Sequence, residues 1–348
     1  MNDKELTGLL DSLGSSQLDW HERGRLSRNK IWGKKVFVRA VVEVSSYCRQ
    51  NCSYCGMRRD NESLERYRME ADLLREILFE NLPPSVTDIN IQAGEDPVVV
   101  REVVIPLIRE VRENTSLGIS VCLGSLDGKL YQELYEAGAD LYIIKLESGN
   151  EAHYKKMLAP GTLAKRLDAI RTLVAQGWMV SSGYIHGLPH QTKEHVLETI
   201  RLLETLPLSG NSVSPFIAGQ DTVWSDHPSG CLEAALNAVA AMRLLKPERI
   251  IPAVSAMSIL HPDGYVRALQ AGANLSTINL TPEGWRENYQ LYKKERYIMS
   301  EQRVIAAIDK AGLEPSIVSM TEVLRSFSEP AGLNAVPSLA SFEEIKST

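Results

Sequence analysis

Two hydrophobic periods alternate along this chain of 348 residues and limit the folds that it can adopt. Short runs of apolar and β-branched residues are typical of buried strands, whereas apolar residues three and four positions apart are typical of amphipathic helices. The strand-like runs are Lys35–Ser46, Val86–Ala93, Gly118–Leu123, Leu141–Glu147, Met179–Tyr184, Asn211–Ile217, Ile250–Ala256 and Ala273–Asn279. The helix-like stretches between them include Glu70–Asn81, Val100–Glu113, Leu163–Gln176, Thr192–Leu206 and Leu232–Leu245. Strands that alternate with helices predict a parallel sheet with right-handed crossovers.

Eight strand-like runs favour closure of this sheet into a complete (β/α)8 barrel of the TIM type, a fold that often occupies a chain of this length. An open, doubly wound sheet is the alternative. We expect residues 1–34 to form an N-terminal helical cap, residues 35–315 the barrel, and residues 316–348 a C-terminal extension. In such a barrel, functional side chains lie at the carboxyl ends of the strands.

Composition and charge argue against several classes of partner. The formal net charge is −6, and the chain has no broad excess of basic residues to bind nucleic acid or an acidic membrane surface. The longest apolar runs are strand-sized and too short to cross a bilayer. The first residues, Met1–Leu6, lack the apolar run of a signal peptide. We therefore expect a cytoplasmic protein with no nucleic-acid or membrane partner.

Three of the five cysteines, Cys48, Cys52 and Cys55, stand together directly after the first predicted strand. Their C-x3-C-x2-C spacing lets one loop wrap a metal centre, and thiolates are the usual ligands of iron–sulfur clusters. Three protein ligands leave one iron open to bind a small molecule directly. A zinc site is the rival interpretation. A structural zinc needs four ligands, however, and the nearest later histidine is the distant His153.

With Tyr54 as the aromatic residue before the last cysteine, this loop resembles the motif of the radical S-adenosylmethionine (SAM) superfamily. The resemblance implies one [4Fe–4S] cluster whose open iron binds SAM, and a reductant such as flavodoxin or ferredoxin. Reductive cleavage of SAM would then yield a 5′-deoxyadenosyl radical that acts on the substrate. A second cluster is not expected, because the two other cysteines, Cys122 and Cys231, stand apart and are typical of packed thiols.

The likeness extends beyond the cysteines and covers most of residues 35–315. It is densest in Val38–Val44, Cys55–Asn61, Arg66–Met69 and Gln92–Pro97. These segments are similar to one branch of the superfamily, which contains the maturase of iron–iron hydrogenase, methylornithine synthase and, more distantly, biotin synthase. The branch implies a small amino-acid-like or sulfur-containing substrate. The alternatives are an amino-acid carbon-skeleton mutase like methylornithine synthase and, outside enzymes, a cluster or metal carrier with no chemistry of its own.

The same resemblance assigns positions that bind SAM. It places Tyr54 near the adenine, Glu147 at the ribose hydroxyls or the amino group, and Arg166 at the SAM carboxylate, although a solvated helix face is the alternative for Arg166. A loop after the second strand would bind the SAM amino group, although an acidic residue followed by proline could equally cap the next helix. The residues of this loop are Gly94, Glu95 and Asp96. Gln92, just before the loop, is expected to face the barrel interior.

Substrate binding and catalysis have four candidates, which are Lys145, Ser255, Met257 and Tyr292. Lys145 lies two residues before Glu147 and therefore points the same way; the hydrogenase maturase usually has arginine there. Ser255 and Met257 end the seventh predicted strand. Tyr292 and the cofactor-side Tyr289 resemble a segment that closes over SAM and substrate. Aromatic residues three positions apart can also form a packed helix edge.

Overall fold

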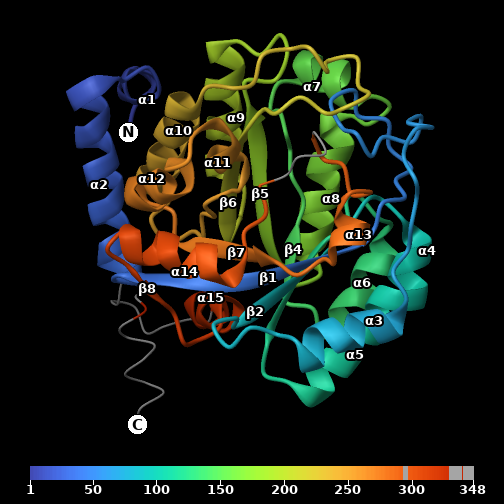
Figure 1. Ribbon diagram of the computed structural model, residues 1–348. Coiled ribbons are helices and arrows are strands. Elements are labelled where there is room, and N and C mark those ends of the chain that lie inside the picture. The colour runs from blue at the N-terminus through green and yellow to red at the C-terminus, as the bar shows by residue number, and fades with distance from the viewer. Residues whose placement is uncertain (293–296, 329–338, 340–348) are drawn as a thin grey trace.

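The computed structural model describes residues 1–292, 297–328 and 339, and its centre is a curved sheet of parallel strands (Figure 1). The strands are β1 (Lys35–Ser45), β2 (Asp88–Ala93), β3 (Gly118–Cys122), β4 (Leu141–Ile143), β5 (Met179–His186), β6 (Gly210–Pro215) and β7 (Leu275–Asn279). They are joined in the order β6-β5-β4-β3-β2-β1-β7. A short strand, β8 (Glu314–Pro315), pairs with the beginning of β1. The predicted α/β fold with a parallel sheet is confirmed.

The predicted strand over Ile250–Ala256 is wrong in its extent. Ile250 and Pro252 form only isolated parallel bridges, to Gly210 of β6 and Leu275 of β7. The amide of Ala253 donates to the Leu275 carbonyl at 2.9 Å. A short helix, α11 (Ala256–Leu260), begins where this strand was expected to end. The segment therefore touches both edges of the sheet without becoming a full strand.

Alternate side chains of β1 lie in two different environments, the internal cavity and the apolar core. Arg39, Val41 and Glu43 line an internal cavity. The residues between them, such as Val38 and Val42, belong to the apolar core outside the sheet. Side chains of a strand point alternately to its two faces, so one face of β1 supports the helices and the other faces the interior.

Helices surround the sheet on its outer side (Figure 1). Those that follow the strands are α3 (Ala71–Arg75) with the π-helical η1 (Glu76–Glu80), α4 (Pro97–Val99), η2 (Val100–Val104), α5 (Ile105–Asn114), α6 (Gly128–Glu136), α7 (Glu151–Leu158), α8 (Leu163–Ala175), α9 (Lys193–Thr205), α10 (Leu232–Leu245), α12 (Gly264–Ala271), α13 (Glu283–Arg286) and α14 (Glu301–Lys310). In the described residues, no helix combines the length and the apolar character that a membrane crossing requires.

Two helices precede the sheet, α1 (Asp3–Leu10) and α2 (Gly14–Trp32). The second lies along α10 and α12, where Arg28 donates to the Leu269 carbonyl at 2.6 Å. Gly24 permits the close approach, because a Cβ there would lie 2.5 Å from the Ala271 carbonyl oxygen. The helices expected in residues 1–34 are therefore observed, packed on the outer side of the fold.

The predicted C-terminal extension begins with a helix, α15 (Met320–Ser328). Its apolar residues join a second core cluster with Trp32 and Phe37, and the Trp32 and Phe327 rings lie 5.2 Å apart. Apart from Leu339, the rest of the predicted extension lies outside the described residues.

Candidate functional site

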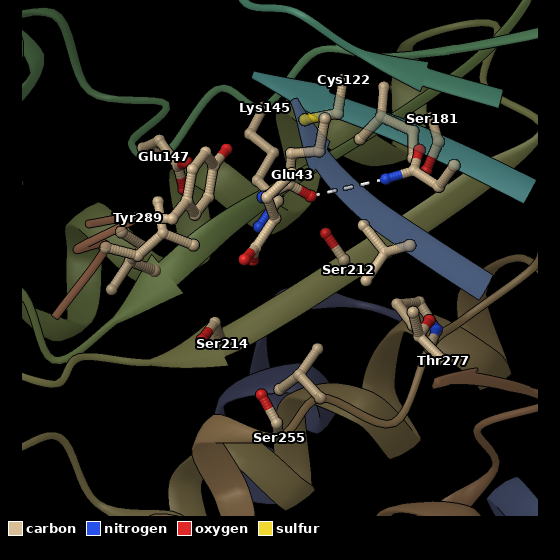
Figure 2. Close-up of a pocket in the computed structure, with 18 of the residues that line it drawn as sticks. Glu43, Cys122, Lys145, Glu147, Ser181, Ser212, Ser214, Ser255, Thr277 and Tyr289 are labelled. Carbon is tan, nitrogen blue, oxygen red and sulfur yellow. Dashed lines mark hydrogen bonds between the residues drawn. The ribbon is translucent and has the colours of Figure 1, made fainter. Parts of the chain in front are cut away.

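An elongated cavity of about 380 Å³ runs inside the sheet, and the cysteine loop after β1 lies at the carboxyl ends of the strands. Figure 2 shows charged side chains and a set of serine hydroxyls converging on this space from different strands. Most residues predicted from the sequence line it, namely Cys48, Cys52, Tyr54, Cys55, Gln92, Gly94, Glu95, Lys145, Glu147, Arg166, Ser255, Tyr289 and Tyr292. The polar residues thus lie where the barrel topology predicts.

Backbone contacts hold the cysteine loop in place. The Ser53 amide donates to the Met157 carbonyl at 2.9 Å, and the Glu95 amide donates to the Cys48 sulfur at 3.4 Å. Burial raises the pKa of Cys55 to about 12 and also raises the pKa of Cys48, where the Glu95 amide partly opposes it. The thiols of the metal-free chain are therefore protonated at neutral pH. A positively charged metal centre would hold them as thiolates.

The donor set fits a cluster better than a single ion. In residues 1–292, 297–328 and 339, no group of three His, Cys, Asp or Glu side chains is placed to hold one metal ion. Cys48, Cys52 and Cys55 nevertheless are free thiols on one cavity. An iron–sulfur cluster separates its thiolate ligands more widely than one tetrahedral zinc does. Three cysteines of one loop on one cavity are therefore a ligand set that suits an iron–sulfur cluster.

The tip of β2 lies against the cysteine loop. A Cβ on Gly94 would lie 2.2 Å from the Tyr47 carbonyl oxygen, so only glycine allows this approach. Next to it, the Glu95 carboxylate accepts from the Ser125 amide at 2.7 Å and the Gln50 side chain at 2.6 Å. Glu95 thus ties the cysteine loop to the loop after β3.

Two residues of the predicted set do not line the cavity. Asp96 is buried and pairs with Arg68 at 2.6 Å, accepts from the Ser45 hydroxyl at 2.7 Å, and caps α4 through the Val98 amide. Both carboxylate oxygens of Asp96 thus bind groups of the protein, in agreement with the alternative that this residue caps the next helix. Met257 is fully buried in α11. The structure thus places neither the predicted cofactor-binding Asp96 nor the predicted catalytic Met257 on the cavity wall.

Glu147 has the most unusual conformation among the candidates. Its φ is 62°, the left-handed region that residues other than glycine rarely adopt. Its Oε2 atom is buried and has no hydrogen-bond partner within the described part of the chain. Burial raises the pKa of this carboxyl, and Lys145 and Arg166 oppose the shift. Backbone strain and an unsatisfied buried oxygen are together typical of functional positions.

Arg166 of α8 faces inward, and the solvated helix face considered for it is wrong. Its side chain is 13% exposed, and its nearest guanidinium nitrogen lies 3.9 Å from the Glu95 carboxylate. Its Nε donates to the Tyr154 hydroxyl at 3.2 Å. The guanidinium therefore lies on the cavity wall between α8 and the loop after β2.

The sequence analysis missed several residues of the wall. Arg39 is buried and donates to the Thr277 hydroxyl at 3.3 Å, and its Nε has no partner among the described residues. Glu43 and Cys122 also line the cavity, so Cys122 is not a thiol of the outer core (Figure 2). The available signal for Arg39 and Glu43 was a pair of charges four positions apart, and therefore on one face, in an otherwise apolar strand.

Comparison with known proteins agrees with the geometry. Residues 42–203 match the family model of the Radical SAM superfamily. The [FeFe] hydrogenase maturase subunit HydE of Thermotoga maritima is 33% identical over 265 residues, which are 76% of each chain. The 3-methylornithine synthase of Methanosarcina barkeri is 25% identical over 324 residues, 91% of each chain. A crystal structure of methylornithine synthase (PylB) matches with a TM-score of 0.81 and 24% identity, covering 94% of this chain and 96% of the other.

The sequence likeness to enzymes covers three quarters or more of the chain, and the likeness in structure extends over nearly all of it. The cysteine loop that carries the motif lies in the matched region, at one end of the internal cavity. This chain is an enzyme of the radical SAM superfamily, a family whose chemistry depends on an iron–sulfur cluster and SAM.

Proposed function

We propose that this enzyme holds one [4Fe–4S] cluster on Cys48, Cys52 and Cys55 and cleaves SAM reductively to act on a small amino-acid-like or sulfur-containing substrate. The observation that carries the proposal is the placement of three free thiols on one cavity with buried charges of both signs. Glu147 and Arg166 supply those charges beside the cysteine loop. SAM carries a cationic amino group and an anionic carboxylate, which these two side chains complement.

The residues of the chain have separate tasks in this proposal. Glu147 accepts hydrogen bonds from the ribose hydroxyls or amino group of SAM, and Arg166 pairs with its carboxylate. Tyr54 covers the adenine, and the loop that contains Gly94 and Glu95 binds the SAM amino group. Gln92 and Tyr289 complete this side of the cavity. When bound, the cluster and SAM supply an electron and a carbon-centred radical.

On the substrate side, we assign Lys145 and Ser255 to the substrate carboxylate and Tyr292 to the closing of the cavity. An enclosed site keeps water and reductant away from a reactive intermediate. Completeness of the barrel is part of this proposal. The bridges of Ile250 and Pro252 to both edge strands support closure.

The organisation of the chain and its surroundings remain proposals of the same kind. We assign residues 1–34 to an N-terminal helical cap, residues 35–315 to the barrel and residues 316–348 to an extension. A flavodoxin or ferredoxin would deliver the electron. The cytoplasm is the compartment we propose, since it keeps thiols reduced for cluster assembly.

Anaerobic reconstitution tests the proposed function. We expect about four irons per chain, and loss of iron in Cys52→Ala. Reduction should convert SAM to 5′-deoxyadenosine and methionine. Cys231→Ala, which removes an exposed cysteine, is the matched control and should keep iron and cleavage. An active protein that binds zinc and no iron would refute the proposal.

A carbon-skeleton mutase is the second candidate, supported by the 25% identity with 3-methylornithine synthase over 91% of each chain. Incubation with candidate amino acids separates the two candidates. A mutase returns an isomer of the same mass, whereas a maturase-like reaction changes the composition of its substrate. Iron and SAM binding without any SAM cleavage would instead indicate a carrier.

A further inference from the structure

The cavity reaches much deeper than the cysteine loop. Its lining includes the first residues of three strands, which are Leu141 of β4, Gly210 of β6 and Leu275 of β7. The amino ends of parallel strands lie at the side of a barrel opposite to its active site. The cavity therefore extends along the whole length of the strands, whereas layers of side chains usually fill such an interior.

A residue from the far end of the sequence closes this deep end. Met320, the first residue of α15, lines the cavity and is only 1% exposed. It lies in one apolar cluster with Phe37, Leu141 and Leu275, each at or near the beginning of a strand, in β1, β4 and β7. The helix thus contributes its first side chain to the same space that the cysteines line from the other end.

A buried carboxylate fixes α15 in this position. Asp88, the first residue of β2, is fully buried, and its Oδ2 accepts from the Met320 amide at 2.8 Å. Its Oδ1 accepts from the Thr321 amide at 3.2 Å and the Ser319 hydroxyl at 2.9 Å. A carboxylate that binds the first amides of a helix stabilises that end of the helix. Asp88 therefore positions Met320.

The fit between α15 and the sheet leaves no spare space. A Cβ on Gly118, the first residue of β3, would lie 1.9 Å from Asp88 Oδ1 and 2.3 Å from the Thr321 hydroxyl. Asp140, just before β4, accepts hydrogen bonds from the Arg325 side chain of α15 and from the Ile119 amide of β3. Residues at the beginnings of the adjacent strands β2, β3 and β4 thus surround and hold α15.

We propose that Met320 is the floor of the substrate cavity and that α15 is the plug that closes the amino end of the barrel. This assignment rests on the proposed function only in naming the substrate as the occupant. Met320 then sets how deep a substrate can extend, and Asp88 is its positioning residue. The small-molecule substrate is accordingly bounded by the cysteine loop at one end and by a methionine side chain at the other.

Thiol labelling tests this placement without requiring SAM chemistry. We compare Met320→Cys with the matched control Leu324→Cys, which lies on the same helix and in the same cluster but does not line the cavity. Exposure alone predicts slower labelling at position 320, because Met320 is 1% and Leu324 4% exposed. A floor residue predicts the opposite order, since methyl methanethiosulfonate can enter through the mouth of the metal-free chain.

We expect labelling of the α15 peptide, measured by mass spectrometry, to be at least about tenfold faster for Met320→Cys than for Leu324→Cys, a difference of about 1.4 kcal/mol in barrier. Cluster and SAM, once loaded, should slow the labelling at position 320 by blocking the mouth. Equal rates in the metal-free variants, with folded circular dichroism spectra, would overturn the floor assignment. Failure of iron or SAM binding would refute the proposed function and leave the metal-free comparison valid.

Discussion

At the residue scale, Glu147 combines two features that oppose folding, a φ of 62° and a buried oxygen without a partner among the described residues. A left-handed conformation costs about 1–2 kcal/mol for residues other than glycine. The free energy of unfolding of Glu147→Gly should therefore exceed that of Glu147→Ala by about 1 kcal/mol. Both variants should lose about 2 kcal/mol of SAM affinity, roughly 30-fold. Denaturant unfolding and SAM titration measure these effects, and equal stability of the two variants would contradict the strain.

The titration of Glu147 adds a dependence on pH. Burial raises the pKa of this carboxyl in the folded chain, so its contribution to stability is present below its unfolded pKa and lost as pH rises through the folded pKa. At neutral pH the metal-free Glu147→Gln variant should therefore be more stable than the parent chain. The difference should vanish on acidification. A Glu147→Gln variant that is no more stable than the parent chain at neutral pH, measured by denaturant unfolding, would contradict the burial of this charge.

At the element scale, the contact between β3 and α15 depends on a glycine. The Cβ of Gly118→Ala would meet Asp88, which four donors hold in place, so we expect a loss of about 1–3 kcal/mol in stability. Gly8→Ala is the matched control, because a Cβ at Gly8 in α1 has nothing within 4 Å. The control should gain up to about 1 kcal/mol through helix propensity. Thermal unfolding of both variants checks the contrast, and a neutral Gly118→Ala would contradict this packing.

The elements also show what sequence patterns can predict. Helices with a full amphipathic period were placed within a residue or two of their observed bounds, as for α8 (Leu163–Ala175) and α10 (Leu232–Leu245). The apolar run Ile250–Ala256 has the composition of a strand but forms only isolated bridges, because α11 begins at Ala256. Composition indicates burial, whereas the length of a strand depends on the partners that it meets in the folded chain.

At the scale of the whole molecule, side chains on the outer face of the sheet should contribute more to stability than those that face the cavity. Val42 packs between β1 and the helices, whereas its neighbour Val41 borders the cavity. Val42→Ala should cost about 2 kcal/mol because it leaves a void in packed surroundings. Val41→Ala should cost less than about 1 kcal/mol, since its methyl groups already face open space. Urea unfolding of the metal-free variants tests this, and an equal loss in both would show a filled interior.

The site was predictable where one segment carries its own pattern, as the cysteine loop does. The floor and part of the wall, such as Arg39 and Glu43, were not predicted, because they depend on contacts between distant parts of the chain. The Asp88 carboxylate and the Met320 amide, 2.8 Å apart, are separated by 232 positions in sequence. No hydrophobic period in the sequence indicates such a contact, and methionine is an ordinary residue type for a protein core. Alternation in β1 was the one local sign that Arg39 and Glu43 face inward.

The hollow axis of the barrel has an evolutionary consequence. In this enzyme the residues that line the cavity and the residues that pack the core occupy opposite faces of the same strands. An inward substitution can therefore alter the accepted molecule at little thermodynamic expense, and selection for a new reaction need not begin with compensating changes in the shell. Sequence relatives with names as different as [FeFe] hydrogenase maturase subunit HydE and 3-methylornithine synthase are the expected outcome of that freedom.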